Sequence, residues 1–133
     1  MEEKKKIVGF KDLEVYRRTY EASIQVMTKV LPKLPENEKY DLKDQLSRSC
    51  KAIPRLIAEG YAKRHQFKGF QKYLDDAMDE CNEIIVSLNH CSDLYAKFVD
   101  KSLCDELAKE HDTAGRQLYR LAESWSRMKG VVR

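Results

Sequence analysis

A row of basic side chains is the strongest chemical signal in this sequence. Arg48, Lys51 and Arg55 are spaced by three and four residues, so a helix places them on one face, opposite its apolar residues. Such a row can follow a phosphate backbone. Three further cations form a cluster, namely Lys63, Arg64 and Lys68. A second row of cations is formed by Arg116, Arg120 and Arg127. Tyr61, or His65 nearby, could stack on an unpaired base. We predict that these residues form a nucleic-acid interface.

Charge is distributed unevenly along the 133 residues. The formal net charge is +3, but residues 43–72 carry a net +6, residues 73–112 a net −8 and residues 113–133 a net +4. One basic end can therefore attract nucleic acid although the whole surface is mixed. Charge rows also occur on solvated helix faces and against acidic rows at subunit boundaries, so the pattern leaves these interpretations open.

Motifs for catalysis and metal binding are absent from the sequence. Di-iron helical bundles carry Glu-x-x-His, yet the residues three before His65, His90 and His111 are alanine, serine and alanine. No phosphate-binding glycine loop and no nucleophile elbow occurs. The acidic pairs at 75–76 and 79–80 are interpreted as the solvated face of a helix. We expect a non-enzymatic protein without metal or cofactor.

Cysteine spacing and the lack of long apolar runs indicate the compartment. The cysteines stand at positions 50, 81, 91 and 104, without a Cys-x-x-Cys pair. This favours buried free thiols in a reducing cytoplasm over disulfides or metal ligands. No run approaches the roughly 18 apolar residues of a membrane span, and the N-terminus lacks the apolar region of a signal peptide. We expect a cytoplasmic protein with no membrane partner.

Apolar residues recur at steps of three and four in four segments, which predicts four amphipathic helices. The first stripe is Leu13, Tyr16, Tyr20, Ile24, Met27 and Leu31, and the second is Leu42, Leu46, Cys50, Ile53 and Ile57. The third is Phe67, Phe70, Leu74, Ala77, Cys81, Ile84, Leu88, Cys91 and Tyr95, and the fourth is Leu103, Leu107, Ala114, Leu118, Leu121, Trp125 and Met128. Packed antiparallel, the helices bury all four stripes together, which predicts an all-α, up-down-up-down four-helix bundle. The bundle is expected over residues 10–129, between tails at 1–9 and 130–133.

Single residues indicate where these helices begin, bend and end. Asp12 is predicted to cap the first helix, and Ser102 with Asp105 to form a capping box for the fourth. Pro54 lies within the second stripe, where it removes a backbone hydrogen bond, so we predict a kinked second helix and not two helices. That helix is expected to end near Gly60.

Three segments of the sequence resemble a known family: FKDLEVYRRTYE, QLSRSCKAIPRLIAEGYAKR and FKGFQKYLDDAMDE. Over about residues 8–125, they look like the four-helix-bundle family of bacterial 23S rRNA intervening-sequence proteins. The most specific motif, Ile-Pro-x-x-Ile-Ala-Glu-Gly, is matched by Ile53, Pro54, Ile57, Ala58, Glu59 and Gly60. The opening motif, Phe-x-Asp-Leu-x-Val-aromatic, is matched by Phe10, Asp12, Leu13, Val15 and Tyr16. Ala52 and Leu56 replace a serine and an asparagine common in the family, so no polar role is carried over to them.

The resemblance implies a small bundle that assembles as a homopentamer. The fold is also similar to the accessory variability determinant of diversity-generating retroelements, a basic pentamer that binds nucleic acid and a reverse transcriptase. We expect an oligomeric protein that binds structured RNA or another nucleic acid, RNA or DNA. The alternative is a protein-interaction scaffold or an accessory subunit of a reverse transcriptase.

Large aromatic rings also favour self-association, independently of the resemblance. They are more numerous than one thin bundle readily hides, and aromatic side chains are enriched between subunits. The rings are Tyr16, Tyr20, Phe67, Phe70, Tyr73, Tyr95, Phe98, Tyr119 and Trp125. We expect some of them to lie between subunits.

Overall fold

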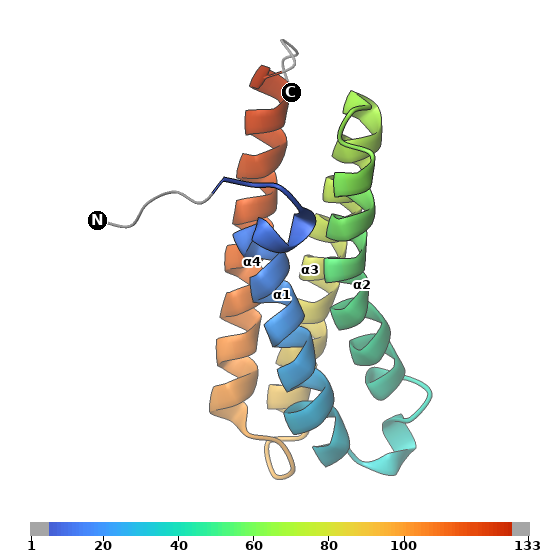
Figure 1. Ribbon diagram of the computed structural model, residues 1–133. Coiled ribbons are helices and arrows are strands. Elements are labelled where there is room, and N and C mark those ends of the chain that lie inside the picture. The colour runs from blue at the N-terminus through green and yellow to red at the C-terminus, as the bar shows by residue number, and fades with distance from the viewer. Residues whose placement is uncertain (1–5, 129–133) are drawn as a thin grey trace, which may run out of the picture.

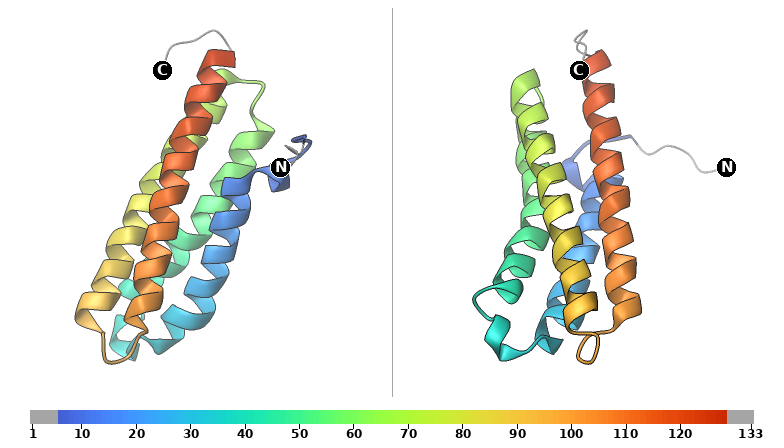
Figure 2. Two further views of the ribbon diagram at one scale, coloured as in Figure 1. Left: turned by 90° about the vertical axis from the view of Figure 1, so that its left-hand side faces the viewer. Right: turned by 180° about the vertical axis from the view of Figure 1, so that it is seen from behind.

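Four long helices pack side by side in an antiparallel bundle. The computed structural model of the protein describes residues 6–128. The helices are α1 (Glu14–Gln25), α2 (Leu42–Ala62), α3 (Phe67–Leu94) and α4 (Lys101–Met128), and the described residues contain no strand. Both α2 and α4 pack against α1 and against α3, so α2 and α4 stand at diagonally opposite corners (Figures 1 and 2). The predicted all-α bundle is confirmed. Of the predicted tails, residues 1–5 and 130–133 lie outside the described residues.

The chain enters α1 through a short 3-10 turn, η1 (Phe10–Asp12). The Asp12 carboxylate accepts hydrogen bonds from the backbone N–H groups of Val8 and Gly9, at 2.9 and 3.0 Å. It therefore holds the residues before the turn, and the prediction that Asp12 caps the first helix is wrong. Leu13 takes the cap position of α1 without a side-chain hydrogen bond, and its side chain is buried. Burying a leucine contributes about 1.5–3 kcal/mol, more than the ~1 kcal/mol of a typical polar cap.

The first helical segment buries only part of the stripe that its spacing predicts: Leu13 is buried, and Tyr16, Met27 and Leu31 are half-buried against the core. The buried residues of α1 and of the turn after it are Val15, Thr19, Ala22, Ser23, Val26 and Val30. Tyr20 and Ile24 remain 49% and 46% exposed. The Thr19 hydroxyl donates to the Val15 carbonyl at 2.9 Å, and the Ser23 hydroxyl to the Tyr20 carbonyl at 2.6 Å. Because both hydroxyls are hydrogen-bonded within the helix, Thr19 and Ser23 can be buried. The larger Tyr20 side chain stays at the edge of the core, partly exposed to solvent.

Short turns connect α1 to α2. A π-helical turn, η2 (Val26–Val30), continues α1, and two 3-10 turns follow, η3 (Leu31–Lys33) and η4 (Glu36–Glu38). The Glu38 carboxylate accepts hydrogen bonds from the backbone N–H of Leu42, at 3.3 Å, and from the hydroxyl of Tyr95. It therefore ties the start of α2 to the end of α3.

The second helix, α2, continues without a break through Pro54. All residues of its predicted stripe are buried. A full break at this proline is thus excluded, and a kink there stays a prediction. The helix ends near Gly60, as predicted, because its last residue is Ala62. Gly60 itself lies inside the last turn. Its missing side chain serves packing, since a Cβ at Gly60 would lie 2.7 Å from the Cβ of Tyr73 on α3.

The third helix buries most of its predicted stripe, and the fourth buries the middle of its stripe. Leu103, Leu121 and Trp125 are half-buried, and the side chain of Met128 lies outside the described residues. Phe70, Leu74, Ala77, Cys81, Ile84, Leu88, Cys91, Leu107, Ala114 and Leu118 are buried. The start of α4 differs from the prediction, because the Asp100 carboxylate accepts the hydrogen bond from the N–H of Leu103, at 3.1 Å. Ser102 is exposed within the first turn, so the predicted capping box with Asp105 is wrong. None of the helices within residues 6–128 has the length and apolar character needed to cross a membrane.

Candidate nucleic-acid interface

Three cations form a row on the outer surface of α2. Arg48, Lys51 and Arg55, here called the basic row, are exposed, whereas the apolar stripe of the same helix is buried. Arg48 Nε lies 2.9 Å from the Asp44 carboxylate, and Arg55 Nε lies 3.7 Å from that of Glu59. Exposed pairs of residues four apart contribute only about 0.3–0.5 kcal/mol. Lys51 forms no ion pair with any described residue. All three cations can therefore contact an anionic ligand with little loss of stabilising free energy from their present ion pairs.

Two glutamates of α3 flank the basic row on one side. Glu80 and Glu83 share a groove of about 360 Å³ with the three cations. The Ser49 hydroxyl and the Gln45 amide each donate to Glu83 Oε2 at 3.4 Å. Burial raises the pKa of Glu80, and the neighbouring Glu83 raises it further. Of the acidic residues predicted to line a solvated face, Asp75 and Asp79 are exposed, and Asp76 and Glu80 are half-buried. The surface is thus basic on α2 and acidic toward α3.

The α2–α3 turn and the first residues of α3 carry a second group of cations. Lys63 and Lys68 are exposed and Arg64 is half-buried; these three are called the turn cluster. The Arg64 guanidinium carbon lies 4.1 Å from the centre of the Tyr61 ring, and Arg64 Nη1 donates to the Tyr61 carbonyl at 2.9 Å. The indole N–H of Trp125, on α4, donates to the Arg64 carbonyl at 3.2 Å. Because Arg64 covers one side of the Tyr61 ring, a base could stack on that side only after Arg64 moves.

The second predicted row lies on a different face of the bundle. Arg116 and Arg120 line a groove of about 340 Å³ between α3 and α4, and Arg116 Nη2 lies 3.1 Å from the Asp112 carboxylate. Since α4 is diagonal to α2, one short ligand cannot contact these arginines and the basic row together. Arg127 is exposed near the end of α4, at the same end of the bundle as the turn cluster (Figure 1). The predicted interface is therefore divided between two faces.

Residues from both motifs of the family resemblance meet in one groove. Ile53, Ile57 and Leu13 lie in the core. Phe10 and Tyr16 of the opening motif and Pro54 and Ala58 of the second motif line a groove of about 270 Å³, here called the α1–α2 groove. Its other lining residues are Tyr20, Ser23, Lys51 and Arg55. This groove was not predicted from the sequence, because the spacing of Tyr16 and Tyr20 assigned both rings to the core stripe. The small residues near them, Thr19 and Ala22, were the signal for which face of α1 is buried.

A comparison with known protein families agrees with the resemblance. The family model described as 23S rRNA-intervening sequence protein matches residues 11–120. The chain belongs to this family. Comparisons with curated proteins and with solved structures give no match. The matched residues include the basic row, the turn cluster and every residue of the α1–α2 groove except Phe10.

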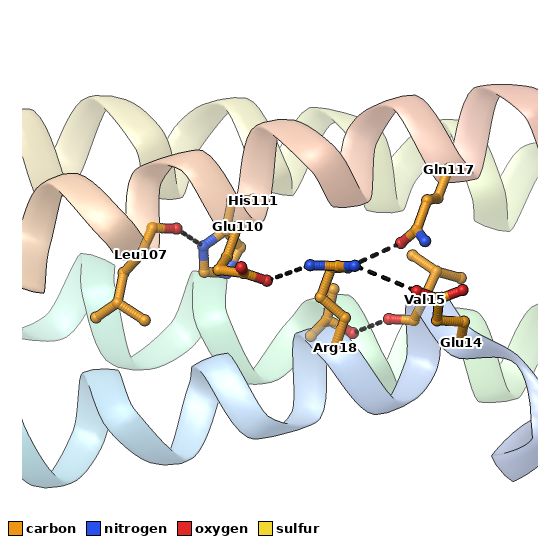
Figure 3. Close-up of polar contacts among 8 residues, drawn as sticks. Glu14, Val15, Arg18, Leu107, Glu110, His111 and Gln117 are labelled. Atoms are coloured by element: carbon orange, nitrogen blue, oxygen red, sulfur yellow. Dashed lines mark hydrogen bonds and ion pairs between the residues drawn. The ribbon is translucent and has the colours of Figure 1, made fainter.

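One further arginine of this 23S rRNA-intervening sequence protein is held by the bundle itself. Arg18 Nη1 lies 2.5 Å from Glu110 Oε2, its Nε donates to Gln117 at 3.2 Å, and its Nη2 lies 3.2 Å from Glu14 (Figure 3). The hydrogen bond to Glu110 raises the pKa of Arg18. These contacts join α1 to α4, so Arg18 serves the fold. Only its spacing of four from Glu14 was visible in the sequence.

Burial keeps the cysteine thiols in their protonated form. All four cysteines are buried and free. Burial raises the pKa of Cys50 to about 11 and those of Cys81 and Cys91 to about 12, so these thiols stay protonated near neutral pH. His111 Nδ1 donates to the Leu107 carbonyl at 2.7 Å, and its buried Nε2 has no partner among the described residues. Within residues 6–128, no three metal-ligating side chains are grouped.

Proposed function

We propose that this protein binds RNA through the basic row and the turn cluster and catalyses no reaction. The observation that carries the proposal is the exposure of Arg48, Lys51 and Arg55 on one face of α2, with the turn cluster at the end of the same helix. From Arg48 to Lys63 the helix rises by roughly 22 Å. Cations spread over this length can contact several successive phosphates, which makes binding sequence-independent and salt-dependent.

Self-association is part of the proposed function. Val86, Leu94 and Phe98, on α3 and in the turn after it, are 53%, 64% and 56% exposed, which supports a contact between copies. The family resemblance implies a homopentamer. Assembly would present several basic rows to one RNA and raise the affinity by multivalency. Light scattering of the purified protein at micromolar concentration tests this, and a monomer mass would overturn it.

Charge reversal tests the RNA interface. The variant Arg48→Glu/Lys51→Glu/Arg55→Glu reverses the basic row. The control Lys97→Glu/Lys101→Glu/Lys109→Glu changes the net charge equally at exposed lysines toward the other end of the bundle. We expect the row variant to bind a fluorescein-labelled RNA hairpin about ten-fold or more weakly at low salt, and the control to bind nearly as the wild type does. Equal losses in both variants would assign binding to net charge alone.

A protein partner is the second candidate function. The presence of Glu80 and Glu83 beside the basic row favours it, because a surface with both charges also complements a protein of mixed charge. A reverse transcriptase is the partner suggested by the related fold. A reverse-transcriptase gene next to the gene of this protein would support this function, and co-elution of the two purified proteins would test it.

A further inference from the structure

The α1–α2 groove combines aromatic walls with small side chains. The Tyr16 and Tyr20 rings are stacked, with centroids 5.9 Å apart and 29° between their planes. Phe10 meets the Tyr16 ring edge-on at 4.9 Å. Pro54 and Ala58, on α2, line the same space and do not fill it. Since the Tyr20 side chain is 49% exposed, part of this ring system is open to solvent.

The charged residues that line this groove are both cations. Lys51 and Arg55 line it, and none of its lining residues is acidic. Lys51 has no ion-pair partner among residues 6–128, and the contact of Arg55 with Glu59 is long, at 3.7 Å, with both side chains largely exposed. The groove on the other side of the basic row is lined by two glutamates. An anion is therefore favoured on the α1 side of the row.

We propose that the α1–α2 groove binds single-stranded nucleic acid. An unpaired base stacks on the Tyr16–Tyr20 pair, and the adjoining phosphates contact Lys51 and Arg55. Single-strand binders combine these two interactions, a stacking surface for bases and cations for the backbone. A base inside a duplex has both faces covered by its neighbours, so it cannot stack here. The inference rests on the RNA binding proposed above and specifies which form of the strand enters the groove.

A second copy of the chain is the alternative occupant of the groove. Covering the rings with protein would also bury Lys51 and Arg55, and a buried cation needs an acidic partner. The groove lining supplies none, so a second copy would have to bring a carboxylate to each cation, whereas a nucleic-acid strand brings a phosphate with every base. The charge of the lining therefore favours the strand.

Fluorescence anisotropy with two probes tests the inference. The probes are a labelled oligouridine of about 12 nucleotides and an RNA duplex of the same length. Tyr20→Leu keeps an apolar side chain and removes the ring. Tyr40→Leu is the matched control, because Tyr40 is 87% exposed in the connection before α2 and lies outside the groove. We expect Tyr20→Leu to weaken oligouridine binding about five-fold or more and to leave duplex binding nearly unchanged, while the control changes neither.

The possible results separate this inference from the proposed function. If Tyr20→Leu binds oligouridine as the wild type does, or if the wild type binds only the duplex, the groove assignment fails and RNA binding stands. If the wild type binds neither probe at low salt, both fail. If Tyr20→Leu lowers the mass measured by light scattering, the groove is a contact between copies and the inference is overturned.

Photocrosslinking of the wild-type chain gives a readout that needs no variant. With 4-thiouridine in the oligouridine, crosslinked peptides identified by mass spectrometry are expected to contain Tyr16 and Tyr20. Crosslinks confined to the α2–α3 turn would overturn the assignment.

Discussion

Trp125 donates its indole N–H to the backbone carbonyl of Arg64 at 3.2 Å and thereby fastens the end of α4 to the α2–α3 turn. The same indole packs edge-on against Phe70, with 4.9 Å between ring centroids. The turn cluster is therefore positioned by a residue distant in sequence that carries no charge. Its geometry depends on bundle packing as well as on the local sequence.

Trp125→Phe tests whether this positioning matters. The variant loses the hydrogen bond and keeps a ring beside Phe70, so we expect the free energy of unfolding to fall by about 1–2 kcal/mol. We also expect a few-fold weaker RNA binding with no change in charge. Chemical denaturation and fluorescence anisotropy measure the two effects. If stability falls and RNA affinity does not, the position of the turn cluster is irrelevant to binding.

The same substitution in two helices should have opposite effects. Gly60→Ala places a Cβ 2.7 Å from the Cβ of Tyr73, and we expect it to destabilise the fold by about 1–3 kcal/mol. Gly115→Ala has its nearest neighbour, Cys81 Cβ, at 4.0 Å, so it should stabilise by up to about 1 kcal/mol through helix propensity. Thermal and urea unfolding measure both variants. A Gly60→Ala variant as stable as Gly115→Ala would contradict the close packing of α2 on α3.

Neutralising the acidic neighbours of the basic row should strengthen RNA binding. Glu80→Gln/Glu83→Gln removes two negative charges from the groove that these glutamates share with the basic row. The control, Glu21→Gln/Glu106→Gln, removes two negative charges from the groove between α1 and α4. We expect a larger gain of affinity in the first variant, measured by anisotropy. Equal gains would mean that only net charge matters.

The pH dependence of binding follows from the same pair of glutamates. Because the pKa of Glu80 is raised by burial, the wild-type affinity for RNA should increase as the pH falls through that pKa. The Glu80→Gln/Glu83→Gln variant should lack this increase. Titration of both proteins from neutral to mildly acidic pH checks it.

His111 should make stability depend on pH. Burial lowers its pKa below the ordinary 6.5, with partial opposition from the Leu107 carbonyl and from Glu110. The unfolded chain then binds this proton more readily than the folded one, so stability is full above the unfolded pKa and falls as the pH drops below it. We expect the wild type to lose stability relative to His111→Leu between about pH 7 and pH 5. Urea unfolding across this range measures the difference, and a relative gain for the wild type would show that protonated His111 finds a partner.

All predicted stripe residues of α2 and most of those of α3 are buried, because one apolar stripe left little choice of face. In α4 the prediction placed Leu107, Ala114 and Leu118 in the core and missed Cys104, His111 and Ala122. Leu46, Ile53 and Leu88 are fully buried at the predicted positions. The helix α1 has apolar residues on a wider arc, and periodicity alone could not choose between the face of Tyr20 and that of Ala22. The face with the small side chains is the buried one, because small side chains allow α1 to approach its neighbouring helices closely. The hydroxyls of Thr19 and Ser23 can be buried there because they are hydrogen-bonded within the helix.

The candidate interface was predictable only in part, because spacing along one helix indicates which face is exposed but not which residues of other helices lie beside it. The spacing of Arg48, Lys51 and Arg55 fixed their exposure on one side of α2. Their surroundings depend on which helices pack beside α2, so neither the glutamates on α3 nor the aromatic groove on α1 could be read from α2 alone. Arg116 and Arg120 formed an equivalent row in the sequence, and only the diagonal position of α4 separates them from the first row.

The salt dependence of RNA affinity tests the central claim most directly. Binding of the wild type, the row variant and the lysine control is measured between about 50 and 200 mM salt. Each lost phosphate contact lowers the slope of log affinity against log salt by about 0.7–0.9. Loss of the three contacts of the basic row should therefore reduce the slope by about 2–3 in the row variant, and the control should keep the wild-type slope. An unchanged slope in the row variant, or no binding by the wild type at the lowest salt, would contradict RNA binding through α2.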